Sequence, residues 1–322
     1  MRVIDHISSP ELTLSVEIEP PLLRKGITGV YEVLDPLVNL GIKYVDITYH
    51  SERIIEYAQR NGFGQVPITT RKKPGTLGVA GAIIGRYAGK IDPVPHVICT
   101  SFTKYDTENL LAELDFLGVN NILALRGDPP RDRTGQFMTF ESMPHGNANA
   151  TELIEQVDDL RRAVYVAAKP GRSIDFCIGA ACYPEKYAES TSLDHDIDVM
   201  KAKVDAGAEY FVTQMFFNNE KYFDFIELVN KNGLNIPIVP GITPVSSYGQ
   251  LEVIPRVFNT EIPAVLKKQM EPYCKDAAAV EEIGLNWAIS QTQELIRAGT
   301  KSLHFYASRG AKIKELLEGI KQ

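Results

Sequence analysis

Short apolar runs alternate with longer amphipathic stretches along the chain. Runs rich in β-branched and aromatic residues predict eight strands, at residues 13–19, 44–49, 96–101, 121–127, 175–183, 209–217, 237–243 and 302–308. Helical spacing of apolar residues, with a glycine near each end, predicts helices at 103–119, 150–171, 196–208 and 220–233. Such alternation implies parallel strands covered on both faces. The pattern therefore predicts an α/β fold, a single (β/α)8 TIM barrel, with a doubly wound open sheet as the alternative.

Two stretches are longer than a minimal barrel requires. One, at 63–95, lies between the second and third strands, and the other, at 247–299, is mostly helical and precedes the last strand. Neither has a strand set or an apolar core of its own in the sequence. We therefore expect both to be extensions of one domain that spans residues 1–322, without a regulatory domain. The part at 70–92 is expected to form a lid or a contact between subunits.

Composition and charge argue against several classes of partner. The 34 lysine and arginine residues against 41 aspartate and glutamate residues give a net charge of −7, which argues against nucleic acid as the main partner. No apolar run is long enough to cross a bilayer, and the first residues lack the pattern of a signal peptide. The four cysteines form no CxxC pair, so reduced and mostly buried thiols are expected. These features predict a cytoplasmic protein without a membrane partner.

Polar residues recur near the ends of the predicted strands. The carboxyl ends of the strands form the reactive face of a (β/α)8 barrel. Each polar residue alone has an ordinary explanation, such as a hydrogen-bonded core histidine for His96 or His304, or an ion pair between Arg126 and Asp128 that closes a turn. Their recurrence at one end of at least six strands predicts a ligand cavity. The set comprises Glu17, Glu19, Asp46, Thr48, Tyr49, His50, Thr100, Arg126, Asp128, Tyr183, Glu185, Thr213, Gln214, His304, Tyr306 and Arg309.

Searches for common catalytic motifs give little. No GxGxxG follows a strand and no GxxxxGK[ST] is present, so neither a dinucleotide fingerprint nor a P-loop is predicted. HExxH and GxSxG are also missing, so metal chemistry and a serine nucleophile have no support. The least ordinary residue is Gln214, because its amide lies between "FV" and "MFF". Such an amide must find hydrogen-bond partners or cost about 1–3 kcal/mol.

An ordered set of motifs carries a family resemblance. It comprises "SVEIEPP", "VDITYH", "PHVICTSFT", "LALRGDPP", "ACYPEKY", "KVDAGAEYFVTQMFF", "PGITPVSSYGQ" and "LHFYASR". In this order and spacing, from about residue 14 to about residue 309, the chain resembles the methylenetetrahydrofolate reductase family, in its bacterial single-domain form. The resemblance implies a (β/α)8 barrel that holds FAD without a Rossmann motif. It also implies hydride transfer from NADH or NADPH through the flavin to methylenetetrahydrofolate, which gives 5-methyltetrahydrofolate.

The resemblance also assigns roles to residues. Glu17 takes the place of the general acid, which protonates the leaving nitrogen as the folate ring opens, while Glu19 has the same facing on the strand. Asp128 takes the place of a carboxylate close to both flavin and folate. No metal is expected. The matching FAD contacts are Thr48, Tyr49, His96, Arg126, Gly127, Asp128, Ala150, Tyr183, Asp196 and Lys203, and the matching substrate contacts are Asp128, Gln214, Gln250 and Arg309.

Other interpretations make different demands on the sequence. A flavin-free barrel lyase or aldolase would need a Schiff-base lysine at a strand end or a metal-binding carboxylate cluster, and no predicted strand ends in lysine. A non-catalytic barrel subunit would be expected to lack Glu17 or Asp128. No arginine is clearly placed to bind a 2′-phosphate, which favours NADH over NADPH. A homo-oligomer, dimer or tetramer, is expected from the resemblance.

Overall fold

The computed structural model describes residues 1–49, 53–60, 64–70, 72–130, 132, 134, 136–167, 171–307 and 312–321. Its main sheet contains all eight predicted strands, and every neighbouring pair is parallel. The third strand begins at Asp92, four residues before the predicted start at His96. The strands are β1 (Thr13–Ile18), β2 (Tyr44–Ile47), β5 (Asp92–Ile98), β6 (Asn121–Leu125), β7 (Cys177–Cys182), β8 (Tyr210–Thr213), β9 (Ile238–Val239), β10 (Gly241–Ile242) and β11 (Ser302–Tyr306).

The sheet closes on itself at Pro240. The strand order runs β10-β11-β1-β2-β5-β6-β7-β8-β9, so the two ends of the order are consecutive pieces of one chain segment. β9 pairs with β8 and β10 pairs with β11, on either side of Pro240. Proline has no N–H to donate to a ladder, which accounts for the break between the two pieces. The barrel prediction is confirmed, and the open-sheet alternative is wrong.

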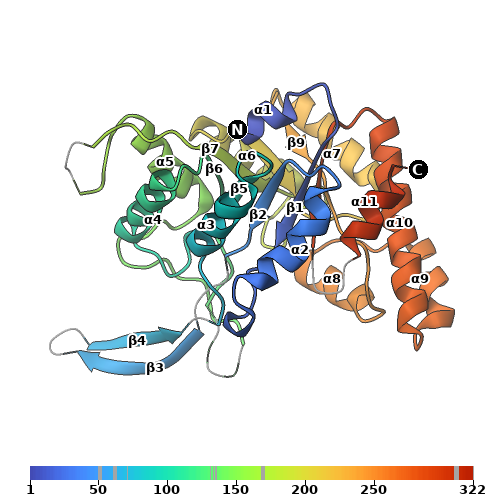
Figure 1. Cartoon of the computed structure of the whole chain (residues 1–322), viewed down its shortest axis with the longest axis horizontal. Coiled ribbons are helices and arrows are strands. Elements are labelled where there is room, and N and C mark those ends of the chain that lie inside the picture. Colours follow the sequence, from blue (N-terminus) through green and yellow to red (C-terminus); the bar gives the residue numbers. More distant parts are fainter. Residues whose placement is uncertain are drawn as a thin grey trace.

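Helices cover the outside of this barrel, as Figure 1 shows. Their inner faces pack against the outward-facing strand residues in one large apolar layer, for example Leu34, Leu111 and Phe225 against Val16, Val97 and Phe211. Several begin at a side-chain cap, since Thr103, Asn149, Ser192 and Asn218 each accept a hydrogen bond from a backbone N–H in the first turn. The helices are α2 (Thr28–Val38), α3 (Thr76–Tyr87), α4 (Lys104–Phe116), α5 (Ala150–Arg161), α6 (Leu193–Asp205), α7 (Asn219–Lys231) and α11 (Ile313–Gly319), with a 3₁₀ turn η1 (Leu23–Lys25).

The predicted helix at 150–171 is too long. α5 ends at Arg161, and Ala163 has a positive φ of 56°, which stops the helix. The backbone N–H of Val164 then donates to the Asp159 carbonyl oxygen over 2.9 Å, which closes the turn. The β-branched residues Val164 and Val166 favour helix weakly, so the apolar pattern alone overestimated the length.

The two long stretches differ from the predictions. A two-stranded antiparallel hairpin, β3 (Arg53–Arg60) with β4 (Gly64–Thr70), follows β2 and projects from the barrel (Figure 1), so the expectation of no further strands was wrong. Residues 76–87 of the stretch at 70–92 form α3, which packs on the outside of the barrel and is not a lid. A contact between subunits stays a prediction. The later stretch forms α8 (Gln250–Phe258), α9 (Ala264–Met270), η2 (Glu271–Tyr273) and α10 (Ala277–Arg297). Residues of α8, α9 and α10 share an apolar cluster with Phe217 and Val245, separate from the main barrel cluster, so the expectation of no apolar core in this stretch was also wrong.

A short N-terminal helix, α1 (Val3–Ile7), closes the amino-terminal end of the barrel. Figure 1 shows it at the end away from the β3–β4 hairpin. Val3 is fully buried among inward-facing apolar residues such as Tyr44 and Val94. Its backbone N–H donates to Asn121 Oδ1 over 2.7 Å, at the start of β6. Because this end is plugged, ligands can reach the barrel interior from the opposite end.

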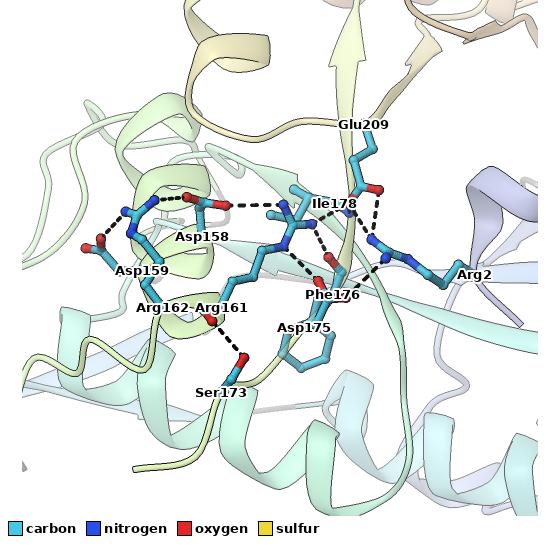
Figure 2. Close-up of polar contacts among 10 residues, drawn as sticks. All are labelled: Arg2, Asp158, Asp159, Arg161, Arg162, Ser173, Asp175, Phe176, Ile178 and Glu209. Atoms are coloured by element: carbon cyan, nitrogen blue, oxygen red, sulfur yellow. Dashed lines mark hydrogen bonds and ion pairs between the residues drawn. The ribbon is translucent and has the colours of Figure 1, made fainter. Parts of the chain in front are cut away.

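Charged residues strengthen the same closed end. Figure 2 shows Glu209, just before β8, between the guanidinium groups of Arg2 and Arg161. Both arginines also pair with Asp175, just before β7. This network, Arg2–Glu209–Arg161–Asp175, therefore ties α1 and α5 to two strand beginnings.

We expect Glu209→Gln to lower the free energy of unfolding by about 2 kcal/mol, because two half-buried guanidinium groups lose their shared carboxylate. The matched control is Asp159→Asn, which removes a carboxylate that pairs with the exposed Arg162. Exposed pairs contribute little, so the control should lose less than about 1 kcal/mol. Chemical denaturation measures both variants, and equal losses would contradict the assigned difference.

Candidate active site

The carboxyl-terminal half of the barrel interior is polar. Side chains of one face alternate along a strand, so Ser15 and Glu17 of β1 both point inward. In the sheet register Glu17 lies beside Asp46 of β2 and Tyr306 of β11. Gly241 leaves room for an aromatic ring there, since a Cβ on it would lie 2.5 Å from the Tyr306 ring. The Tyr306 hydroxyl donates to the backbone oxygen of Thr213 of β8, past the β9–β10 segment that lies between β11 and β8.

Glu17 faces a histidine at the open end. Its Oε2 lies 3.7 Å from His96 Nε2, and the Glu17 side chain is 23% exposed. The same His96 nitrogen lies 3.6 Å from Asp46 Oδ1. Two residues that the motifs singled out, Glu17 and His96, are thus brought together, with Asp46 as a third member that the motifs did not assign.

Burial raises the pKa of Glu17 to about 7. The proximity of His96 acts in the opposite direction, and the negative charges of Asp46 and Glu19 add to the increase. Glu19 itself is exposed and pairs with Lys73, as expected for a solvated carboxylate. A carboxyl group with a pKa near neutrality can hold a proton at physiological pH and release it during a reaction.

The raised pKa of Glu17 predicts how the free energy of unfolding depends on pH. Glu17 binds its proton more tightly in the folded protein than in the unfolded chain, where the pKa is 4.5. Its contribution is present at low pH and is lost as the pH rises through about 7, up to about 3 kcal/mol in total. The side chain introduced by Glu17→Gln cannot ionise. Between about pH 5 and pH 8 we therefore expect the free energy of unfolding of this variant to increase relative to that of the wild type. Denaturation curves across this range measure the gain, and two parallel pH profiles would contradict it.

Arg126 organises the opposite side of the open end. Its guanidinium makes two hydrogen bonds to Glu189, of 2.6 and 2.8 Å, and lies over the ring of Phe140 at 4.9 Å. The ring of Tyr187 is 5.7 Å away, and its centroid lies 4.7 Å from that of the Tyr183 ring, at a tilt of 42°. The ordinary interpretation of an Arg126–Asp128 pair is therefore wrong, because Glu189 takes that place. Asp128 remains exposed at the rim, beside this aromatic group.

Gly127 fixes the turn between these two charged residues. Its φ is +82°, a conformation that glycine adopts without strain. A Cβ there would lie 2.9 Å from Ile98 Cβ and 2.9 Å from Thr100 Oγ1. The carbonyl oxygen of Arg126 accepts hydrogen bonds from the Cys99 and Thr100 backbone N–H groups at 3.1 and 3.2 Å. The end of β6 is thus held against the end of β5.

The remaining residues that were predicted to contact FAD or the substrate lie on several different elements. Thr48 donates its hydroxyl to the Ile18 carbonyl oxygen, the Tyr49 ring meets Phe102, and Ala150 is the first residue of α5. Asp196 and Lys203 are buried on α6, where Asp196 accepts from the Tyr187 N–H and Lys203 donates to the Ala181 carbonyl oxygen. The side-chain oxygens of Gln214 and Gln250 accept from backbone N–H groups near them in sequence. Arg309 lies outside the described residues, as does His50 of the predicted polar set.

Sequence reasoning did not assign the partners of these groups. Asp46 and His304 are 0% and 1% exposed, and His304 Nδ1 lies 2.9 Å from Ser15 Oγ and 3.6 Å from Asp46 Oδ2. The core interpretation of His304 is confirmed. Alternation along β1, β2 and β11 is the signal that could have grouped these side chains. The pairing of Arg126 with Glu189 has no comparable signal, because a loop conformation decides it.

Some other features do not mark a site. A groove of about 620 Å³ lies near the amino-terminal end and is lined by residues such as Ile4, Lys201 and Pro237, far from the polar interior layer. Within the described part of the chain, no three His, Cys, Asp or Glu side chains are grouped as a metal ion would need. The described helices include none with the length and apolar character of a membrane span. Cys99, Cys177 and Cys182 are buried and Cys274 is exposed, as predicted.

Known proteins resemble this chain over nearly its whole length. The methylenetetrahydrofolate reductase family model matches residues 2–320. A Caenorhabditis elegans protein named probable methylenetetrahydrofolate reductase (NADPH) is 28% identical over 99% of this chain, which spans 44% of that protein. A Salmonella typhimurium 5,10-methylenetetrahydrofolate reductase is 26% identical over 94% of this chain and 88% of its own length. The chain thus spans about half the length of its eukaryotic relatives.

A solved structure shares the fold. An uncharacterised Clostridium thermocellum protein, described as binding two copies of 5-methyl-5,6,7,8-tetrahydrofolic acid, superposes with a TM-score of 0.57. It is 17% identical, and the match covers 97% of this chain and 94% of that one. At this identity the likeness bears on the fold alone. On the strength of the family match and the barrel that carries its motifs, the chain belongs to the methylenetetrahydrofolate reductase family.

Proposed function

We propose that this protein reduces 5,10-methylenetetrahydrofolate to 5-methyltetrahydrofolate with NADH or NADPH, through bound FAD. The observation that carries the proposal is the inward-facing Glu17, whose pKa is raised to about 7 at the open end of the barrel. Membership of the family supplies the substrate class. A buried acid that is protonated near neutral pH is what the ring opening of this folate requires.

The residues present fit a flavin dinucleotide. Arg126 Nε is buried and has no hydrogen-bond partner among the described residues, so it offers a donor for a phosphate or flavin oxygen. Lys203, with three N–H donors, uses one on the Ala181 carbonyl oxygen. The rings of Tyr183 and Tyr187 provide apolar surface next to Arg126. These residues, with Thr48, Tyr49, His96, Gly127, Ala150 and Asp196, would hold the cofactor, whose chemistry is hydride transfer between nicotinamide and folate.

The chain's own groups would handle the proton and the charge. Glu17 would donate its proton to the leaving nitrogen of the folate ring, which breaks the carbon–nitrogen bond and leaves a cationic iminium. The carboxylate of Asp128, exposed at the rim, would stabilise that positive charge. Gln214, which follows β8, would hydrogen-bond the substrate and make room for the nicotinamide. Gln250 and Arg309 remain proposed substrate contacts.

A reconstitution experiment tests the function. Purified protein is incubated with FAD, freed of excess cofactor and reduced by NADH or NADPH without oxygen. We expect retained flavin absorbance, bleaching by one nicotinamide, and reoxidation when methylenetetrahydrofolate is added, with 5-methyltetrahydrofolate as the product. Absence of flavin binding, or reduction without folate-dependent reoxidation, would contradict the proposal. The same experiment identifies the preferred nicotinamide.

Asp128→Asn tests the rim carboxylate. We expect weaker folate binding, by about tenfold, because about 1.4 kcal/mol of charge stabilisation is lost. The reduction potential of the flavin should rise, since removing a nearby negative charge favours an anionic reduced form. Spectroelectrochemistry and folate titration measure the two effects. An unchanged potential would leave Asp128 as a turn residue.

A further inference from the structure

Asp46 is a carboxylate buried inside the barrel. It lies on β2, is 0% exposed, and neither carboxylate oxygen has a hydrogen-bond partner within the part of the chain that the structure describes. Taking a carboxylate out of water without a partner costs several kcal/mol. A buried group of this kind therefore needs a nearby proton or positive charge, and its surroundings identify the candidates.

Two histidines flank Asp46. Oδ1 lies 3.6 Å from His96 Nε2 of β5, and Oδ2 lies 3.6 Å from His304 Nδ1 of β11. The remaining titratable groups that face it are the carboxyl of Glu17 on β1 and three tyrosines, Tyr44, Tyr210 and Tyr306. Burial raises the pKa of each tyrosine, so these hydroxyls stay neutral. The charges that act on one another here are therefore those of two carboxyl groups, Asp46 and Glu17, and of two imidazoles, His96 and His304.

The nitrogen of His96 is shared. Nε2 is 3.6 Å from Asp46 Oδ1 and 3.7 Å from Glu17 Oε2, so one ring nitrogen faces two carboxyl groups. At these distances neither contact is a hydrogen bond, and Nε2 has no hydrogen-bond partner within the described part of the chain. A hydrogen on Nε2 can complete a good bond to only one of the two carboxyl groups at a time. Asp46 and Glu17 therefore compete for it. When Asp46 accepts this bond, an ionised Glu17 loses its nearest donor and also faces a second negative charge.

We propose that Asp46 is a positioning residue for the acid: it competes with Glu17 for the single Nε2–H of His96 and thereby disfavours the ionised form of Glu17. The inference extends the role proposed for Glu17, on which it rests. His304 Nδ1 lies 2.9 Å from Ser15 Oγ, and this contact anchors the imidazole on the far side of Asp46. Asp46 is thus held between the two rings, beside Glu17 in the sheet register.

The experiment titrates Glu17 itself. The infrared band of its protonated carboxyl group is assigned by its loss in Glu17→Gln, and the band is followed with pH in ligand-free protein. In Asp46→Asn, which keeps the shape, the midpoint should fall by about one pH unit, a tenfold increase in the ionisation constant. Asp46→Ala should lower the midpoint as well, and melting curves verify that each variant is folded. The control, Glu19→Gln, removes an exposed and ion-paired carboxylate of the same strand, so its shift should be much smaller.

The outcomes separate this inference from the proposed function. A lower midpoint in both folded Asp46 variants, with a parallel acid shift in the folate half-reaction and none in the NADH half-reaction, supports it. An unchanged or higher Glu17 midpoint in a folded Asp46 variant overturns it, whatever the activity. If the wild type shows no folate-dependent reoxidation, the proposed function fails, and the infrared titration still decides whether Asp46 controls Glu17.

Discussion

Glu17→Gln should leave reduction of the bound flavin by NADH intact and slow the folate half-reaction by about a hundred- to ten-thousand-fold. The amide has the size of the carboxyl group but cannot give a proton to the leaving nitrogen. Reduction of the flavin needs no ring-opening proton, so the first half-reaction should keep its rate. Glu17 lies in register with Asp46 and Tyr306, and the amide keeps the shape of the side chain beside them. Anaerobic stopped-flow absorbance of each half-reaction measures the two rates separately.

The matched control for this variant is Glu19→Gln. Glu19 lies two residues further along the chain, is exposed, and pairs with Lys73. It should keep both half-reactions within about threefold of the wild type, since exposed pairs contribute less than about 1 kcal/mol. Equal slowing of both half-reactions in Glu17→Gln would remove Glu17 from the acid role. Loss of the folate step in Glu19→Gln alone would transfer that role to Glu19.

Gly127→Ala should cost about 2–4 kcal/mol of folding free energy and lower the affinity for FAD by more than tenfold. About 1 kcal/mol comes from placing alanine at a φ of +82°. The rest comes from overpacking, because the new Cβ would lie 2.9 Å from Ile98 Cβ. The turn can relieve this contact only by moving Arg126 and Asp128 away from the end of β5. Denaturation and flavin titration measure the two losses.

Gly118→Ala provides the control for backbone strain. Gly118 has nearly the same φ, +80°, but a Cβ there would meet no atom within 4 Å. It should therefore lose about 1 kcal/mol of stability and bind FAD normally. The difference between the two variants isolates the close approach of β6 to β5. If Gly127→Ala lost no more stability than Gly118→Ala and still bound FAD, the turn would not position the site.

The barrel could be predicted because its signals are local. Each strand is a short apolar run in the sequence, and the helices between the strands each have a glycine near their carboxyl-terminal end. The order of the elements therefore follows from the sequence. The β3–β4 hairpin was missed although Asn61-Gly62 between its strands is a strong hairpin signal. The end of α5 at Arg161 was missed because the apolar pattern continues past it.

The site was predicted only in part, for a physical reason. Motifs identify Glu17, His96 and Arg126 by residue type and spacing, but their partners are set by long-range geometry. Asp46 meets His96 because the register of parallel strands places both inside the barrel. Glu189 meets Arg126 across 63 residues of sequence, through loops whose conformations carry no simple pattern. Networks of this kind need the folded structure.

The most direct test is the pH dependence of the folate half-reaction in the wild type, with the enzyme reduced beforehand. We expect a single ionisation: the rate is highest at low pH and falls as the pH rises through about 7, because only protonated Glu17 donates. The NADH half-reaction should not show this ionisation. A folate rate that is constant from about pH 5.5 to 8.5, or one that increases through neutrality, would contradict an acid role for Glu17.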